Sequence, residues 1–339
     1  MEGGRKMSVR VAINGFGRIG RLTFRQMMDD SNVDVVAIND IASIDDLAYL
    51  LKYDSALPGA GVEVEAGEDG LVYGGEEIPC SQHENPADLP WDEYGVEVVL
   101  EATGALTDRE SCEAHLSAGA DRVVISANSE GADVTICMGT NHEEYDPDEH
   151  RIISGASCTT NCLAPVAKVL DEQFGIETGF LTTVHGVTST QAVVDVPASK
   201  RRRGRSALVS IIPTTTGAAE ATTIVLPELE GKIDGMAMRV PVILGSICDF
   251  VVQTEKPVSV EEINDTFKRR ADSDELTGVL GYTEDEIVSP DIIGTSWSAL
   301  FDAESTMVLG QNAAKILAWY DNEWGYGARM LELCSYVTR

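Results

Sequence analysis

The sequence predicts an α/β protein of two domains: a doubly wound parallel sheet in the N-terminal half, then an α+β domain with a mostly antiparallel sheet. Three observations predict this class. The 339 residues suffice for about two domains. A glycine-rich turn joins the first predicted strand to the first predicted helix. After residue 158, long β-branched runs replace the earlier alternation of short strands and helices.

The composition is that of a globular protein. Hydrophobic residues make up 43% of the chain and aromatic residues 6%, which is enough apolar surface to offset the entropy of ordering the chain. No stretch reaches the roughly 18 apolar residues of a membrane span, and the best candidate, residues 239–252, is interrupted by Asp249. We therefore expect a soluble protein.

The charge balance is strongly acidic, with 56 acidic against 25 basic residues and a net charge of −31. Such a surface repels phosphate backbones and anionic lipids, which excludes a general nucleic-acid or membrane partner. Only 8 of the basic residues are Lys. Because concentrated salt screens carboxylate repulsion, this composition predicts a halophilic protein.

The seven cysteines predict neither a disulfide framework nor a zinc site, because they are odd in number, scattered, and without a C-x-x-C pair or a close His. The first ten residues lack a secretory apolar segment, so we expect a cytoplasmic protein. Met7 is a candidate natural start, with residues 1–6 a tag or an extension.

The first elements form a predicted βαβ unit. Residues 9–14 are expected to form a buried strand, residues 22–28 carry apolar side chains at helical spacing, and residues 33–38 are a second apolar run. We expect further parallel strands at residues 96–100, 122–126 and 135–139.

The turn at residues 15–20 has the pattern G-x-G-x-x-G and predicts a dinucleotide-binding (Rossmann) site. Glycines let the backbone approach a pyrophosphate, which the free N–H groups at the helix start can bind. Asp40 ends the second strand 20 residues beyond Gly20, where a carboxylate can bind a ribose hydroxyl and oppose a 2′-phosphate. This favours NAD over NADP; the alternative is that Asp40 caps a helix.

In the second half we expect a helix near residues 161–174 and a final helix at residues 324–336. Pro165 should bend the former or move its start later. Predicted strands lie at residues 180–187, 236–242, 247–254 and 314–319.

Cys158 and His185 are the candidate catalytic pair. A thiol at a helix N-terminus ionises more easily, which makes Cys158 a candidate nucleophile. The alternative is a buried inert cysteine, which suits Cys162 better. His185 lies late in a predicted strand and could act as general base, or it could be a hydrogen-bonded core residue. The other four His residues lie in acidic or loop-like segments: His83, His115, His142 and His150.

Two features indicate anion recognition. Residues 214–217 offer hydroxyls and backbone N–H groups, and Arg239 is an isolated cation in an apolar strand. The alternative for Arg239 is an internal salt bridge. Residues 200–205 also concentrate five basic side chains, which could attract a phosphorylated substrate or pair with an acidic subunit.

Six segments carry a resemblance to a known family: NGFGRIGR at residues 14–21, LLKYDS at 50–55, SCTTN at 157–161, TTVH at 182–185, GMAMRVP at 235–241 and WYDNEWGY at 319–326. In this order they closely resemble the phosphorylating glyceraldehyde-3-phosphate dehydrogenases, across almost the whole chain. The nearest alternatives are an erythrose-4-phosphate dehydrogenase, which releases its product with water, and a non-catalytic NAD-binding redox sensor.

The resemblance implies a homotetramer and three segments in each chain: a Rossmann NAD-binding domain at residues 7–157, a catalytic domain at 158–321, and a C-terminal helix at 322–339 that packs back on the first domain. It implies that the Cys158 thiolate attacks glyceraldehyde 3-phosphate while His185 takes the hydroxyl proton. After hydride transfer to NAD, inorganic phosphate would release 1,3-bisphosphoglycerate from a thioester. The step is reversible, so it would serve glycolysis and gluconeogenesis alike.

The resemblance also implies binding residues. Substrate phosphate would be held by Thr188 and Arg239. Attacking phosphate would be held by Ser157, Thr159, Thr216 and Gly217. The cofactor would contact Phe16, Gly17, Arg18, Ile19, Asp40, Ser126 and Asn322. Residues 126–128 depart from the family pattern because Asn128 replaces its usual proline and no lysine follows, and Pro197 matches the NAD-using members.

Overall fold

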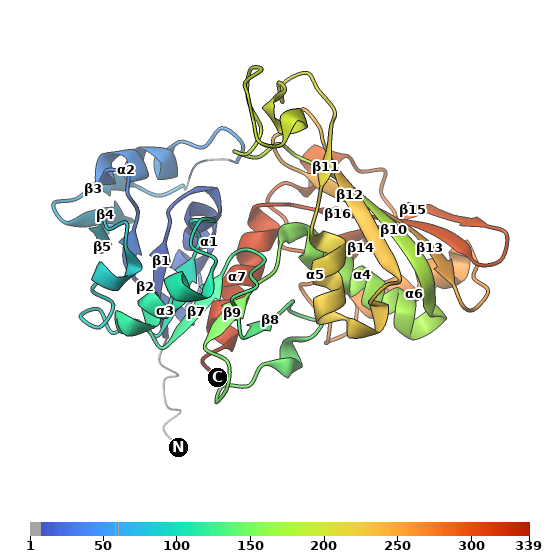
Figure 1. The fold of residues 1–339 in the computed structure, drawn as a ribbon, viewed down its shortest axis with the longest axis horizontal. Helices are drawn as coiled ribbons and strands as arrows, with labels where there is room; N and C mark the ends of the chain where they lie inside the picture. Colours follow the sequence, from blue (N-terminus) through green and yellow to red (C-terminus); the bar gives the residue numbers. More distant parts are fainter. Residues whose placement is uncertain (1–7, 58, 60) are drawn as a thin grey trace. The chain divides into compact units, whose positions relative to one another are not determined.

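The computed structural model describes residues 8–57, 59 and 61–339, and the proposed natural start at Met7 lies outside these residues. The chain divides into two compact units (Figure 1). The first unit holds the described residues up to Ile136, together with Glu143–Ala156 and Gly327–Arg339. The second unit holds Cys137–His142 and Ser157–Tyr326.

The first unit is a sheet flanked by helices. Its strands are β1 (Val9–Asn14), β2 (Val33–Asn39), β3 (Val64–Ala66), β4 (Gly70–Tyr73), β5 (Glu76–Ser81), β6 (Val98–Glu101), β7 (Arg122–Ile125), β8 (Val134–Thr135) and β9 (Ile152–Ser154). Its helices are α1 (Arg18–Met28), α2 (Ile44–Lys52) and α3 (Arg109–Ser117). The strand order is β3-β4-β5-β2-β1-β6-β7-β9-β8. Pairing is parallel from β5 to β8, while β3, β4 and β5 form an antiparallel edge.

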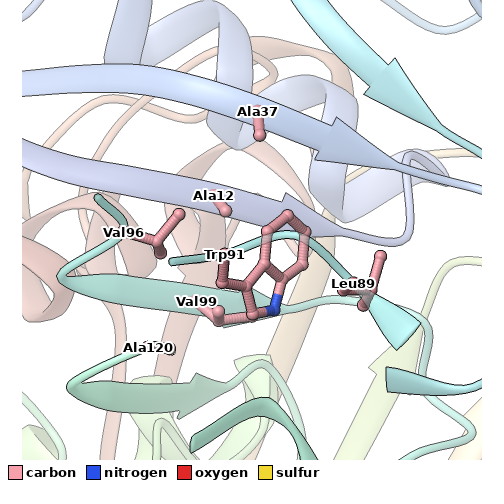
Figure 2. Packing of buried hydrophobic residues seen from close by; sticks show 7 residues of the cluster. All are labelled: Ala12, Ala37, Leu89, Trp91, Val96, Val99 and Ala120. Atoms are coloured by element: carbon pink, nitrogen blue, oxygen red, sulfur yellow. The ribbon is translucent and has the colours of Figure 1, made fainter. Parts of the chain in front are cut away.

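Trp91 anchors one core of this unit. Its indole is fully buried and packs among aliphatic side chains of the sheet and its connections (Figure 2): Ala12, Ala37, Leu89, Val96, Val99 and Ala120. Alanines on β1 and β2 leave room for the indole, because interiors pack without voids. Strands β1, β2 and β6 thereby share one buried core.

The second unit carries a seven-stranded sheet in its described residues. Its strands are β10 (Ile176–His185), β11 (Ile212–Thr215), β12 (Ile233–Arg239), β13 (Ser246–Thr254), β14 (Leu280–Thr283), β15 (Ala299–Leu309) and β16 (Ala313–Tyr320). The order is β11-β12-β10-β13-β16-β15-β14. Only β10 with β12 and β14 with β15 pair in parallel, so the prediction of a mostly antiparallel sheet is confirmed.

Helices α4 (Cys158–Phe174), α5 (Ala218–Val225) and α6 (Val260–Ala271) pack against this sheet (Figure 1). The last helix, α7 (Trp324–Tyr336), begins in the second unit and ends in the first. No described helix combines the length and the apolar composition needed to cross a membrane.

Several local predictions are wrong. Helix α4 starts at Cys158 and continues through Pro165, because the Ser157 side chain accepts a hydrogen bond from the Thr160 N–H and caps the helix there. The strand expected at 135–139 is only the two residues of β8, and β12 ends at Arg239 rather than residue 242. The long strand β15 was not predicted. His115 lies on α3 and is fully buried, not in a loop-like segment.

Candidate active site

The first unit contains a cavity of about 420 Å³ at the carboxyl ends of β1, β2 and β6. Open α/β sheets bind ligands at this edge, where neighbouring crossovers leave the sheet in opposite directions. The cavity is lined by Asn14, Gly15, Gly17, Asn39, Asp40, Ile41, His83, Glu84, Ala102, Thr103, Ala105 and Leu106.

The three glycines of the turn after β1 have different surroundings. A Cβ on Gly15, whose φ is +93°, would lie 2.6 Å from the Thr103 nitrogen, and one on Gly20 would lie 2.1 Å from the Gly15 carbonyl oxygen. A Cβ on Gly17 would have no neighbour within 4 Å. Gly15 and Gly20 are therefore needed for close packing, while Gly17 leaves its backbone open to a ligand at the start of α1. This cradle fits a dinucleotide pyrophosphate.

Asp40 projects its carboxylate at this cavity. Its Oδ2 accepts a hydrogen bond from the Phe16 N–H at 2.7 Å, and its Oδ1 accepts one from the Ala42 N–H at 2.9 Å. Helix α2 is capped by Ser43, so the alternative that Asp40 caps a helix is wrong. The carboxylate is positioned to accept ribose hydroxyls, which fits NAD.

The other predicted cofactor residues are more dispersed. Arg18 pairs with Asp54 at 2.6 Å and Ile19 follows it in α1. Ser126 comes directly after β7 in the first unit. Asn322 belongs to the second unit, where its Oδ1 accepts a hydrogen bond from the Ser246 hydroxyl at 2.8 Å.

In the second unit, Cys158 and His185 come together from different elements. Cys158 is the first residue of α4, and His185 is the last residue of β10. Cys158 Sγ and His185 Nε2 are 3.5 Å apart. Ala156, the residue before the N-cap Ser157, has a φ of 54°, a left-handed conformation that is uncommon for non-glycine residues and often found at functional sites.

Burial changes the acidity of both groups. It raises the pKa of the Cys158 thiol to about 11, against the influence of the Arg239 guanidinium and of hydrogen bonds from Thr159. Burial and the Arg239 charge lower the pKa of His185 to about 3. Burial therefore acts on the thiol in the opposite direction to the helix N-terminus, which favours the thiolate. At a pH between these two values, Cys158 Sγ and His185 Nε2 share one proton, which lies on the sulfur or on the nitrogen.

The imidazole is held from several sides. His185 Nδ1 lies 2.7 Å from the Gly186 carbonyl oxygen and also contacts Arg239 Nη1. In the tautomer whose Nδ1–H donates to that carbonyl, Nε2 can accept the thiol proton. Its ring stands edge-on to Tyr320, with centroids 5.9 Å apart. The Tyr320 hydroxyl is hydrogen-bonded to the hydroxyls of Thr159 at 2.9 Å and Thr183 at 2.8 Å.

Arg239 is a cation without a carboxylate. It forms no ion pair with any Asp or Glu in the described part of the chain, so the internal salt bridge is wrong. Its Nη1 donates to the Gly186 carbonyl at 3.1 Å and contacts His185 Nδ1. Its Nε is buried without a hydrogen-bond partner among the described residues. Because an unsatisfied buried donor is costly, this arrangement suits an anionic ligand.

The remaining predicted anion-binding residues carry hydroxyls and N–H groups. Thr188 has its hydroxyl against Thr190 and Gln191, the Thr216 hydroxyl accepts from the Ala218 N–H, and Gly217 is the N-cap of α5. In the basic run at residues 200–205, Lys200 and Arg203 donate to the threonines of β11.

Two residues had no predicted role. Tyr320 supports Thr159 and His185, and the Ser246 hydroxyl accepts from the Gly186 N–H at 3.1 Å while donating to Asn322. Tyr320 lies inside the WYDNEWGY segment beside Asn322, which was the available signal. Ser246, the first residue of β13, lies outside all six motif segments and carried no such signal.

A Rossmann-type dinucleotide pocket in the first unit and a Cys–His pair in the second are the features of an NAD-dependent oxidoreductase. Residues 9–109 match the model of the glyceraldehyde 3-phosphate dehydrogenase NAD binding domain, and residues 157–322 match that of the C-terminal domain of the same enzyme. The chain belongs to the glyceraldehyde-3-phosphate dehydrogenase family.

Similar proteins include the glyceraldehyde-3-phosphate dehydrogenase of Streptomyces coelicolor, which is 50% identical over 98% of this chain and 99% of its own. That of Geobacillus stearothermophilus is 50% identical over 98% of both chains. Glyceraldehyde-3-phosphate dehydrogenase 1 of Bacillus cereus is 49% identical over 97% of this chain and 98% of its own.

Proposed function

We propose that this protein oxidises glyceraldehyde 3-phosphate to 1,3-bisphosphoglycerate with NAD and inorganic phosphate, in glycolysis and gluconeogenesis. One observation carries the proposal: in a chain of this family, the sulfur at the start of α4 lies 3.5 Å from the imidazole at the end of β10. A nucleophile with a base in hydrogen-bond reach is the arrangement that covalent catalysis needs.

The chemistry follows from this pair. As Cys158 Sγ attacks the aldehyde carbon, its proton passes to His185 Nε2 and on to the carbonyl oxygen, forming a thiohemiacetal. NAD supplies the hydride acceptor. His185 then takes the hydroxyl proton while the C–H electron pair leaves as hydride, which produces a thioester on Cys158. A phosphate oxygen attacks the thioester, the C–S bond breaks, and the released sulfur regains a proton from His185.

The substrate phosphate is held by Thr188 and Arg239 in this proposal, and the attacking phosphate by Ser157, Thr159, Thr216 and Gly217. The unpartnered Nε of Arg239 supports the first assignment. The Arg239 charge lowers the pKa of His185. A phosphate dianion beside Arg239 would offset that charge, so binding of substrate makes His185 a stronger base.

We assign NAD contacts to Phe16, Gly17, Arg18, Ile19, Asp40, Ser126 and Asn322, within an NAD-binding domain at 7–157, a catalytic domain at 158–321 and a final segment at 322–339. Gly17 and Asp40 line the cavity, which supports the assignment of these two residues.

The working protein is a homotetramer in this proposal, and it acts in the cytoplasm. Large apolar side chains are exposed along residues 193–211, with exposed fractions from 64% to 82%: Val193, Val194, Leu208, Val209 and Ile211. An exposed apolar group of this size supports an interface between protein chains.

The test is a paired assay. We expect NADH formation from glyceraldehyde 3-phosphate to require inorganic phosphate, because only phosphate resolves the thioester productively. Initial rates with glyceraldehyde 3-phosphate and with erythrose 4-phosphate, each with and without phosphate, measure this. Phosphate-independent oxidation of erythrose 4-phosphate at the higher kcat/KM would instead identify the water-using alternative, and the absence of turnover would favour the redox sensor.

We propose further that the net charge of −31 adapts the protein to concentrated salt. The Debye length falls from about 10 Å at 0.1 M to about 3 Å at 1 M salt, so surface carboxylates repel one another much less at high salt. We expect Tm to rise as KCl is increased from ~0.1 M to above ~1 M, measured by circular dichroism at constant pH. A Tm that falls over this range would refute the adaptation.

A further inference from the structure

A buried carboxylate is hydrogen-bonded to two residues that line the dinucleotide cavity, Asn14 and Thr103. Glu101, the last residue of β6, is 1% exposed, and every group that it contacts is a donor. Its Oε2 accepts from Asn14 Nδ2 at 2.5 Å and lies 3.2 Å from His115 Nε2. Its Oε1 accepts from the Thr103 N–H at 2.8 Å and from the Thr103 hydroxyl. No Lys or Arg in the described part of the chain pairs with it, so hydrogen bonds alone hold this group.

The partner imidazole has a single workable tautomer. Trp91 Nε1–H can only donate, and it donates to His115 Nδ1 at 3.0 Å. Nδ1 is therefore an acceptor, and the ring proton is on Nε2, from which it is donated to Glu101. Protonation of Nδ1 would set two donors against each other inside a core where His115 and Trp91 are both fully buried.

Hydrogen bonds connect this buried pair to the cavity wall. Asn14 Nδ2 donates to Glu101, and Asn14 Oδ1 accepts a hydrogen bond from Asn39 Nδ2 at 2.7 Å. Asn39 Oδ1 in turn accepts one from the His83 N–H at 2.9 Å. All three residues line the cavity.

On the other side, the Thr103 hydroxyl accepts from the N–H groups of Ala105 at 3.1 Å and Leu106 at 3.2 Å. These two residues also line the cavity. The Glu101 carboxylate thus orients the β1 end through Asn14 and the turn after β6 through Thr103.

We propose that Glu101 and His115 are positioning residues for NAD: they set the side-chain and backbone geometry of the cavity floor without touching the cofactor. Both oxygens of Glu101 face donor groups, so only a side chain with two acceptor oxygens, a carboxylate, satisfies the site. The His115 tautomer that Trp91 imposes supplies one of those donors. The inference rests on the proposed NAD-dependent activity, but its test measures binding and needs no turnover.

The decisive variant is Glu101→Gln, which keeps the shape but replaces one acceptor oxygen with an NH₂ group. In either amide orientation that NH₂ faces donors: Asn14 and His115 on one side, Thr103 on the other. We expect the Kd for NAD, measured by calorimetry on the full chain, to rise at least tenfold, because the cavity residues that Glu101 orients through Asn14 and Thr103 lose their fixed geometry. The fold-increase in KM for NAD should exceed the fold-decrease in kcat measured at saturating NAD.

The matched control is Val99→Ala, two residues earlier on β6 and packed against Trp91 in the same core (Figure 2). Deleting buried methyl groups should lower Tm, while the Kd for NAD stays within about twofold of the original. If Glu101→Gln behaves like Val99→Ala, with lower Tm and unchanged Kd, the pair is merely structural and the proposal is overturned. Loss of the proposed activity with an intact effect on Kd would count against the function and not against this inference.

A second pair of variants changes an exposed residue, so the test does not require the buried core to accept a substitution. Thr103 is exposed, so Thr103→Val and Thr103→Ser should both fold. Thr103→Val removes the hydroxyl between Glu101 and the cavity turn and should raise the Kd for NAD several-fold, whereas Thr103→Ser keeps the hydroxyl and should bind NAD more tightly than Thr103→Val. In Glu101→Gln the effect of Thr103→Val should shrink, because the two residues act together. Equal Kd values for the Val and Ser variants would refute the coupling.

Discussion

Replacing Cys158 with serine should reduce kcat by about 10³-fold or more, while NAD still binds. A serine hydroxyl is a far weaker acid than a thiol, and its oxyester would not serve as the thioester does. The cavity at the ends of β1, β2 and β6 is lined only by residues of the first unit, so Cys158 takes no part in it. The measurements are the rate of NADH formation and the Kd for NAD by calorimetry.

Cys162→Ala is the matched control, since Cys162 lies one turn further along α4 and is fully buried. We expect this variant to lose some thermal stability and to keep its kcat within a few-fold. Substantial turnover by Cys158→Ser, or a comparable loss of kcat in both variants, would show that Cys158 is not the nucleophile.

Replacing His185 with asparagine should lower kcat by about 10²–10⁴-fold, the usual contribution of a positioned general base. Nε2 is the only imidazole nitrogen near Cys158 Sγ in the described residues, at 3.5 Å, and an amide cannot take the thiol proton or the hydroxyl proton. Because burial raises the pKa of Cys158, removal of this base should also slow alkylation of the thiol by iodoacetamide near pH 7.

The alkylation rate separates a chemical role from a structural one, since Cys158 and α4 remain in place in the variant. His150→Asn, at a position in the first unit where the ring accepts a hydrogen bond from the Asp146 N–H, controls for the loss of an imidazole and should retain both rates. A His185→Asn protein with both kcat and the alkylation rate within about threefold of the original would contradict the assignment.

Local sequence patterns predicted much of the first unit. The strand at residues 9–14, the glycine turn and the following helix are each specified by neighbouring residues: apolar runs, glycines where a Cβ would clash, and helical spacing. Pro165 was misleading because the cap at Ser157 and the packing of α4 outweigh the loss of one hydrogen bond. The long strand β15 was missed because its pairing with β14 and β16 is not a local property.

The sequence alone determined the candidate residues: a carboxylate at the end of the second strand, a cysteine after a serine, a histidine late in a strand, and an arginine in an apolar run. Only the tertiary structure decided which of these groups lie together and how far each is buried. Cys158 and His185 are 27 residues apart and meet because β10 ends beside the start of α4, while Glu101 and Asn14 are 87 residues apart and meet across adjacent strands. Residue type and spacing are encoded locally, but burial, and with it the pKa of a thiol or the tautomer of an imidazole, depends on which distant segments pack around the group.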